Sequence, residues 1–281
     1  MPTLDSLLIL GGGVMGLAIA QGALNARLIR PSDLHVAEPD PARRAALSAL
    51  GLRAYAGPAL AIRAVLDVEL GPPARRATPI LLAVKPQVFP TLVPDLAPLA
   101  HAPSRLVLSI MAGTRAATIH DAIAPHTRVI RAMPNTPARV AQGVTGISPG
   151  PGATPDDLSL AHHLFFALGP VVETIDESLM DAFTAVAGSG PAYLFHLARA
   201  MEDAAIALGF EPAAARRVVS QTLQGAAALL DGSDPAALRD AVTSKGGTTA
   251  AALGVLDQAR AADTLIRAIT AATDRARELA R

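Results

Sequence analysis

The sequence predicts an α/β domain with a parallel sheet, followed by an all-α domain. Up to about residue 175, short β-branched runs alternate with longer Ala/Leu-rich amphipathic stretches, the pattern of strands joined by crossover helices. Beyond residue 177 the strand-like runs vanish, and Gly and Pro separate Ala-rich segments. A chain of 281 residues is longer than one hydrophobic core usually holds. We therefore expect two domains, over residues 1–176 and 177–281.

Six strands are expected in the first domain, at residues 7–10, 34–38, 80–84, 106–110, 128–131 and 171–175. The second domain should contain helices at residues 191–208 and 213–230, which carry Ala, Leu and Val on most sides. A helical unit of ~100 residues cannot bury that much apolar surface alone. We expect this domain to form a homodimer through its helices, with the possibility of a larger homo-oligomer.

Composition limits the classes of partner. With 51% hydrophobic residues, 17% charged residues and a formal net charge of +0, the chain is globular and has no basic block for nucleic acid or an anionic membrane. No apolar run reaches the ~18–20 residues of a membrane-spanning helix, and the first residues do not resemble a secretion signal. A cytoplasmic protein that acts on a small molecule is expected. The chain has no cysteine, which excludes thiol chemistry, and no metal site is expected.

A glycine loop connects the first strand to the first helix. Gly11, Gly13 and Gly16 form a G-x-G-x-x-G pattern that follows the apolar run 7–10 directly. Gly11 would permit the tight turn, Gly13 would let the backbone approach a pyrophosphate, and Gly16 would let the helix pack closely on the strand. The pattern and its setting predict a Rossmann-type dinucleotide-binding domain.

An acidic residue closes the second predicted strand. Glu38 stands where a carboxylate would bind the adenosine ribose hydroxyls and repel a 2′-phosphate, which favours NADH. Arg43 and Arg44 follow at the start of the next helix and could instead receive the extra phosphate of NADPH, or could simply form a solvated helix face. The sequence leaves the choice between NADH and NADPH open.

The chain has only two lysines, and both lie in predicted loops. Lys85 follows the strand 80–84 and precedes Pro86, so it should lie at the carboxyl edge of the sheet, where ligands of open α/β sheets bind. Pro86 should occupy the first position of the next helix. The next strand ends in Ser109-Ile110-Met111-Ala112-Gly113, which we expect to form the floor under a nicotinamide ring.

Two small-residue loops in the helical half have the form of anion sites. Residues 187–193 (Ala-Gly-Ser-Gly-Pro-Ala-Tyr) lead into a helix, and residues 242–249 (Val-Thr-Ser-Lys-Gly-Gly-Thr-Thr) combine a glycine pair with hydroxyls at a helix start. Free N–H groups at either helix start could hold a carboxylate. Alternatively, the Ser and Thr side chains could act only as helix caps.

These strings together resemble one enzyme family. The glycine loop, Val-Lys-Pro-Gln at 84–87, Arg-Ala-Met-Pro-Asn-Thr-Pro at 131–137, Gly-Ser-Gly-Pro-Ala-Tyr at 188–193, Gln-Thr at 221–222 and residues 243–249 occur in the order and spacing of pyrroline-5-carboxylate reductase. The resemblance runs nearly the full length. It implies an NAD(P)H-dependent oxidoreductase that reduces the C=N bond of 1-pyrroline-5-carboxylate to give L-proline, the last step of proline biosynthesis, with an active site between the two domains near a dimer interface.

The loops and the resemblance together predict the site residues. The expected cofactor contacts are Gly11, Gly13, Val14, Met15, Gly16, Glu38, Val84, Lys85, Pro86, Met111, Ala112 and Asn135. The expected substrate contacts are Ser189, Ser244, Gly247, Thr248 and Thr249. No histidine occurs in the recognised strings, and the family match assigns the proton donor to Thr249, which either protonates the imine or orients an iminium that enters already protonated.

Three positions depart from the family pattern. Lys245 stands where the family usually has proline, Ile110-Met111 replaces smaller residues, and Glu38 replaces a short polar or basic residue. Lys245 could add a cation near the substrate carboxylate.

The sequence leaves two alternative functions open. One is a β-hydroxyacid dehydrogenase-like enzyme, which would need an acid/base lysine on a helix of the second domain. The other is a dinucleotide sensor without turnover.

Overall fold

A computed structural model describes residues 4–70 and 76–279 of the chain. The chain forms two compact units. The first contains Met1–Gly188 and the end of the chain, Ala272–Arg281, and the second contains Ser189–Ala271. The domain boundary predicted between residues 176 and 177 stays a prediction. The two compact units divide after Gly188, and the end of the last helix belongs to the first unit.

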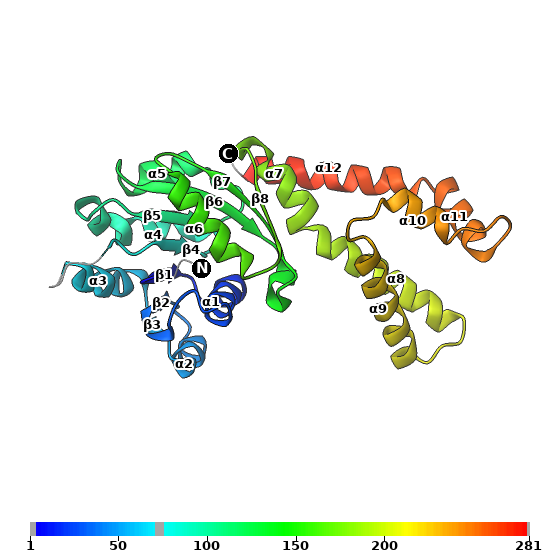
Figure 1. The fold of residues 1–281 in the computed structure, drawn as a ribbon, viewed down its shortest axis with the longest axis horizontal. Coiled ribbons are helices and arrows are strands. Elements are labelled where there is room, and N and C mark those ends of the chain that lie inside the picture. The colour runs from blue at the N-terminus through cyan, green and yellow to red at the C-terminus, as the bar shows by residue number, and fades with distance from the viewer. Residues whose placement is uncertain (1–3, 71–75, 280–281) are drawn as a thin grey trace. The chain divides into compact units, whose positions relative to one another are not determined.

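The first unit is built on a single eight-stranded sheet with helices on both faces (Figure 1). The strand order is β3-β2-β1-β4-β5-β6-β7-β8, so the order reverses between β1 and β4, the place where open α/β sheets bind ligands. The strands are β1 Leu7–Leu10, β2 Leu34–Ala37, β3 Arg53–Tyr55, β4 Ile80–Leu82, β5 Leu106–Ser109, β6 Arg128–Pro134, β7 Val144–Pro149 and β8 Val171–Thr174.

All six predicted strands are present, the first with the predicted bounds and the other five with a different last residue, and the α/β fold class is confirmed. Two further strands, β3 and β7, were not predicted. The sheet is parallel, as expected, except at one place, where β6 and the unpredicted strand β7 pair antiparallel. This pairing also lengthens β6 to Pro134, which lies opposite Thr145.

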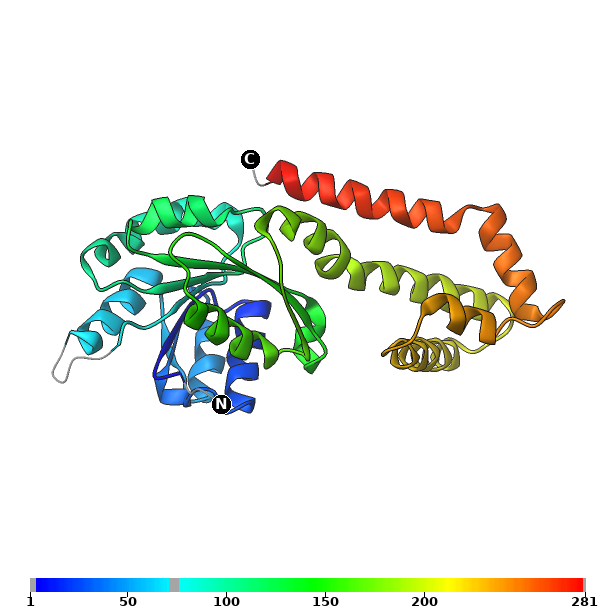
Figure 2. The same cartoon turned by 45° about the horizontal axis from the view of Figure 1, so that its top comes forward.

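The helices of the first unit cover both faces of the sheet (Figure 2). They are α1 Val14–Asn25, α2 Pro41–Ala49, α3 Pro58–Glu69, α4 Phe89–Leu96, α5 Ala116–Ile123, α6 Pro155–Phe166 and α7 Met180–Phe183, with short 3₁₀ helices at Pro31–Asp33, Pro86–Val88, Ala97–His101, Thr136–Val140 and Glu177–Leu179 and a π-helix at Thr184–Gly188. Prolines stand in the first turn of several helices, where their missing N–H costs nothing.

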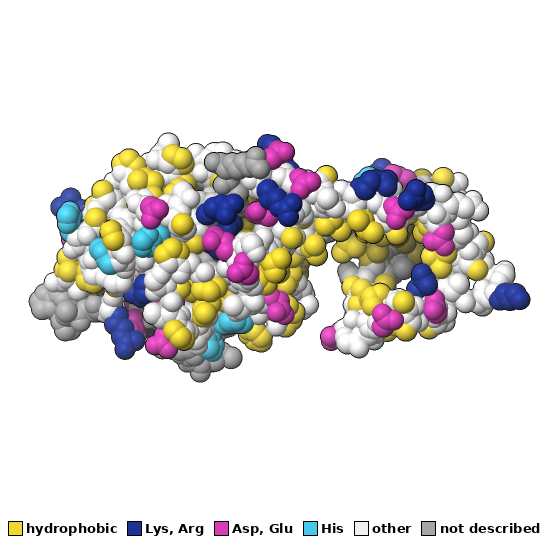
Figure 3. Space-filling model, turned by 90° about the horizontal axis from the view of Figure 1, so that it is seen from above, with side chains coloured by type: hydrophobic (Ala, Val, Ile, Leu, Met, Phe, Trp, Pro, Cys, Tyr) yellow, Lys and Arg dark blue, Asp and Glu magenta, His cyan; other side chains and the backbone are white. Residues whose placement is uncertain are grey.

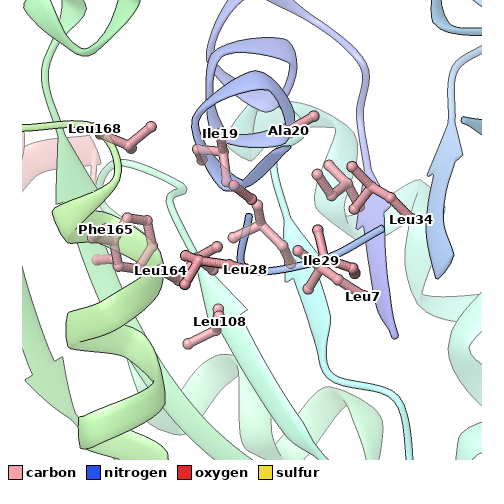
Figure 4. Close-up of a cluster of buried hydrophobic side chains, with 14 of the residues drawn as sticks. Leu7, Ile19, Ala20, Leu28, Ile29, Leu34, Leu108, Leu164, Phe165 and Leu168 are labelled. Carbon is pink, nitrogen blue, oxygen red and sulfur yellow. The ribbon is translucent and has the colours of Figure 1, made fainter. Parts of the chain in front are cut away.

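The sheet buries a hydrophobic core on each face. On one face, Ile19 of α1 and Leu164 and Phe165 of α6 meet strand residues such as Leu7 and Leu108 (Figure 4). On the other face, α3, α4 and α5 pack on the alternate strand residues. Because successive strand residues point to opposite faces, strands buried on both sides read as continuous apolar runs.

The second unit is entirely helical. It contains α8 Gly190–Ala207, α9 Pro212–Leu229, α10 Pro235–Ala241, α11 Thr248–Gln258 and most of α12 Ala261–Leu279. Of residues 189–271, all of which the structure describes, only Ala215 and Val219 are buried in the single chain. Hydrophobic side chains gather on the face of these helices seen in Figure 3. No helix in the described part of the chain is both long and apolar enough to cross a bilayer.

Candidate active site

The glycine loop has the backbone geometry that a dinucleotide requires. Gly11 follows β1 with φ of +114°, and a Cβ there would lie 2.7 Å from the carbonyl oxygen of Ala83. A Cβ on Gly16 would collide with the carbonyl oxygen of Gly11. Only glycine therefore lets α1 start against the end of β1, beside the chain that follows β4.

The amino end of α1 is open. Gly13 is the N-cap residue, provides no side-chain cap, and has no atom within 4 Å of an added Cβ. Val14, the first helical residue, is 66% exposed, and Met15 is half-buried. The unpaired N–H groups and the positive end of the helix dipole can therefore hold a phosphate group.

Glu38 lies directly after β2 and is held in place. Its side chain is buried, at 4% exposure for the residue, and Oε1 accepts a hydrogen bond of 3.0 Å from the backbone N–H of Asp40. An added Cβ on Gly12 would lie 3.1 Å from Oε2, so Gly12 leaves just enough room for the carboxylate. This arrangement fixes a carboxylate at the carboxyl end of β2, and the expected contact with a cofactor ribose stays a prediction.

The two arginines after Glu38 differ in what they contact. Arg44 donates from Nη1 to the carbonyl oxygens of Glu38 (3.0 Å) and Pro39 (2.6 Å), so its guanidinium braces the loop. The Arg43 side chain is 60% exposed, and its Nη1 lies 3.9 Å from Oε2 of Glu38. Arg43 is thus the more available cation for a 2′-phosphate, a distinction that the sequence did not reveal.

The loop after β4 lies against the glycine loop. A Cβ on Gly11 would lie 3.0 Å from the backbone nitrogen of Val84. Lys85 is exposed and occupies the N-cap position of the 3₁₀ helix Pro86–Val88, without a side-chain cap. Pro86 occupies the first position of the next helix, as the sequence predicted; that helix is a 3₁₀ turn, and α4 begins at Phe89.

The loop after β5 begins with a buried segment. The side chain of Met111 packs into the core, and its backbone N–H donates to Oγ of Ser109 at 3.3 Å. Ala112 is half-buried, and Gly113 turns the chain with φ of +70°. These positions lie at the carboxyl edge of β5, the edge that also carries the glycine loop.

Asn135 uses its side chain inside the protein. Its Nδ2 donates to the carbonyl oxygen of Ala187 at 3.1 Å, and its Oδ1 accepts from the N–H of Val144 at 3.0 Å. It thereby ties the end of β6 to the π-helix Thr184–Gly188. Counting only the described residues, one N–H and one lone pair of its amide have no partner, and the expected cofactor contact stays a prediction.

The hydroxyl-rich loops lie at two helix starts in the second unit. Ser189 is the N-cap of α8 and makes no side-chain cap. In the other loop, Gly246 has φ of +74° and Gly247 is the N-cap of α11, again without a side-chain cap. At neither helix start does a serine or threonine side chain cap the helix, so the structure does not show the alternative in which these residues act only as caps.

Three hydroxyls surround the start of α11. The Ser244 hydroxyl lies so close to Gly247 that a Cβ there would collide with it. Thr248 and Thr249 are the first two helical residues. Within the described part of the chain, none of these three hydroxyls has a hydrogen-bond partner, so all remain able to bind a small ligand. Lys245 is exposed in the turn before the helix, not on a helix face.

Comparisons with known proteins agree with this geometry. A family model described as pyrroline-5-carboxylate reductase dimerisation matches residues 177–279, and one described as NADP oxidoreductase, coenzyme F420-dependent, matches residues 6–113. The pyrroline-5-carboxylate reductase of Synechocystis is 38% identical over 96% of this chain and 97% of its own, and that of Methanosarcina acetivorans is 36% identical over 96% of both.

A solved structure has the same fold. The pyrroline-5-carboxylate reductase of Coxiella burnetii superposes with a TM-score of 0.86 at 29% identity, covering 99% of this chain and 100% of that one. The identities extend over nearly the whole chain and include both compact units. The chain therefore belongs to the pyrroline-5-carboxylate reductase family of NAD(P)-dependent oxidoreductases.

Proposed function

We propose that this chain reduces 1-pyrroline-5-carboxylate to L-proline with NAD(P)H. One observation carries the proposal: an open glycine-loop helix start for a dinucleotide occurs in the same chain as a helix start with three hydroxyls that have no hydrogen-bond partner among the described residues, in a member of this family. The cofactor supplies a hydride to the imine carbon. The ring nitrogen takes up one proton, and the products are proline and NAD(P)⁺.

The residues of the glycine loop and its neighbours would bind the cofactor. The N–H groups at the start of α1 hold the pyrophosphate, and Glu38 accepts hydrogen bonds from the ribose hydroxyls. Val84, Lys85 and Pro86, in the segment that follows β4, are further cofactor contacts in this proposal. Met111, Ala112 and Asn135 complete the nicotinamide end in this proposal.

The start of α11 would bind the substrate. Its N–H groups, with the Ser244 and Thr248 hydroxyls, hold the carboxylate at the positive end of the helix dipole. The Thr249 hydroxyl donates a hydrogen bond or a proton to the imine nitrogen. Most of the rate then comes from holding the imine carbon and the hydride donor in line. Ser189, at the start of α8, is a further substrate contact in the proposal.

The proposal includes assembly and compartment. The dimerisation family model supports homo-oligomerisation. We infer a homodimer joined through the helices beyond residue 177, with the predicted domain division at residues 176–177. The cytoplasm is the expected compartment, from the sequence.

A rate comparison tests the function. The purified chain should oxidise NADPH or NADH when racemic pyrroline-5-carboxylate is added, and chiral chromatography should detect L-proline in equal amount. With NAD(P)⁺ and 3-hydroxyacids it should show no turnover, since Lys245 is not on a helix face. Turnover of 3-hydroxyacids alone would favour the dehydrogenase reading, and cofactor binding without turnover would favour a sensor.

A further inference from the structure

An ion pair with no role in the proposed site lies beside the loop that follows β5. Arg131, in the middle of β6, has a side chain that is 4% exposed, and its Nη1 donates to Oε1 of Glu177 at 3.0 Å. The same Oε1 accepts a hydrogen bond of 2.8 Å from the backbone N–H of Ala116. One carboxylate oxygen thus joins the sheet to the first residue of α5.

These contacts fix both ends of one loop. In the sheet, Arg131 pairs with Ser109, the last residue of β5. Ala116 is the first residue of α5. The six residues between them, 110–115, form the β5–α5 loop, which contains Met111 and Ala112 of the proposed nicotinamide site.

Within the described part of the chain, the Glu177 carboxylate is the acidic partner of the Arg131 guanidinium. Nη2 of Arg131 is buried and has no hydrogen-bond partner among the described residues. Removal of the Glu177 charge would therefore leave a buried cation without compensation, and would weaken the hold on the α5 end of the loop. A change at Glu177 should therefore alter the position of the β5–α5 loop, because other contacts would not compensate for it.

We propose that Glu177 and Arg131 are a positioning pair that holds the β5–α5 loop in place against the nicotinamide ring. The proposal rests on the proposed function. Hydride transfer needs the donor and acceptor carbons in close alignment, so a small displacement of the loop lowers the rate even when both ligands still bind. Neither residue contacts the reacting atoms in this account; both act through the loop.

The chain offers a matched control. Glu69 also accepts from a buried arginine, Arg105 (Nη2 to Oε2, 2.9 Å), and from a backbone N–H, that of Thr78 (2.6 Å). Arg105 directly precedes β5, so this second pair lies at the opposite end of that strand. Glu177→Gln and Glu69→Gln make the same chemical change at the two ends.

The first experiment measures turnover with ordinary NADPH and with NADPH carrying two deuteriums at C4. Glu177→Gln should lower kcat about 10-fold or more, leave KM for pyrroline-5-carboxylate within about 3-fold, and raise the deuterium isotope effect on kcat. Glu69→Gln should lower the melting temperature but keep kcat and the isotope effect within about 2-fold of the parent. A merely structural pair would lower the melting temperature in both variants and leave both isotope effects unchanged, which would overturn the proposal.

The second experiment does not depend on turnover. Calorimetry compares NADPH with 2′-phospho-ADP-ribose, which lacks only the nicotinamide. Glu177→Gln should weaken NADPH about 5-fold or more and leave the fragment unchanged; equal effects on both ligands would contradict a role at the nicotinamide end. If the parent binds NADPH but does not reduce the imine, the proposed function fails while this comparison still decides the role of the pair. If Glu177→Gln does not fold, Glu177→Asp, which keeps the charge on a shorter side chain, replaces it in both experiments.

Discussion

Glu38 combines three properties at one position: it is nearly inaccessible, it is hydrogen-bonded to the backbone of Asp40, and it lies against Gly12. A side chain fixed in this way can present its second oxygen, Oε2, to a ligand without a further loss of conformational entropy. The neighbouring Arg43 reduces the repulsion that a 2′-phosphate would meet. We therefore expect cofactor preference to depend on the balance between the buried carboxylate of Glu38 and the exposed guanidinium of Arg43.

The first prediction concerns this balance. The parent should use NADH at least as well as NADPH, and Glu38→Ser should shift the ratio of kcat/KM values toward NADPH by about 10-fold, since a carboxylate–phosphate repulsion of about 1–2 kcal/mol is removed. Arg43→Ala should act in the opposite direction, with Arg44→Ala as a control for loop stability. A strong NADPH preference in the parent would mean that Arg43 outweighs Glu38.

The second prediction concerns the Thr249 hydroxyl. Thr249→Ala should lower kcat by about 10–1000-fold, the usual range for one positioned proton donor or hydrogen bond. Thr249→Ser keeps the hydroxyl and should retain most of the rate. If the alanine variant turns over at the parental rate, Thr249 has no role in the chemistry.

At the residue scale, the sequence predicts backbone roles better than side-chain contacts. Gly11 is required by its positive φ and Gly16 by its close approach to Gly11, which the spacing indicates, whereas Gly13 has no neighbour that an added Cβ would meet. The bracing role of Arg44 and the internal hydrogen bonds of Asn135 depend on which way a side chain points in three dimensions. Nothing in the pattern of neighbouring residues indicates that direction.

At the scale of elements, the missed strands have physical reasons. β3 has three residues and lies at the edge of the sheet, so no long apolar run marks it. β7 contains Gly146 and ends at Pro149, residues that usually indicate a loop. Glycine at position 146 leaves room for the ring of Phe183, since an added Cβ would lie only 3.0 Å from that ring. Strands β1, β2, β4 and β5 were predictable from their apolar residues, because both of their faces are buried.

The third prediction concerns the pair that supports β2 and β3. Nδ1 of His35 lies 2.9 Å from Oη of Tyr55, with the rings stacked at 5.8 Å, and the Tyr55 carbonyl accepts from the N–H of Glu38. Burial lowers the pKa of His35, and the nearby charge of Arg53 lowers it further, against an opposing effect of Asp33.

The sign follows from proton binding. Below the unfolded-state pKa of about 6.5, the unfolded chain binds more protons at this histidine than the folded chain does, so stability falls as the pH drops through that value toward the folded pKa. His35→Phe keeps the ring stack but cannot titrate. Its melting temperature should fall less than that of the parent between about pH 7.5 and pH 5.5. Equal slopes would show that His35 does not contribute.

For the whole molecule, the second unit lacks a core of its own. Only Ala215 and Val219 of its residues, all described, are buried, while Leu194, Phe195 and Leu197 of α8 are exposed. Helices in this condition gain most of their stability from a partner, through interfaces that run to ~2,000 Å² or more. The sequence predicted this need from the excess of Ala, Leu and Val, although it could not assign the helix faces.

The fourth prediction tests assembly. Phe195 is 68% exposed in the single chain, and Phe195→Arg should dissociate the oligomer and abolish most of the activity, because a charge would be buried in the interface. Leu60→Arg, on an exposed position of α3 in the first unit, is the control and should change neither. Sedimentation gives the oligomeric state of each variant, and NAD(P)H oxidation with pyrroline-5-carboxylate gives its activity. A parent that is a fully active monomer at micromolar concentration would refute the need for a partner.

The most direct test of the central claim follows the hydride itself. Pyrroline-5-carboxylate is reduced by the parent chain with NADPH or NADH carrying two deuteriums at C4, and the proline is analysed by NMR and mass spectrometry. We predict L-proline with one deuterium on the ring carbon that was double-bonded to nitrogen, and none elsewhere. Formation of no proline, or of proline without deuterium at that carbon, would contradict the account.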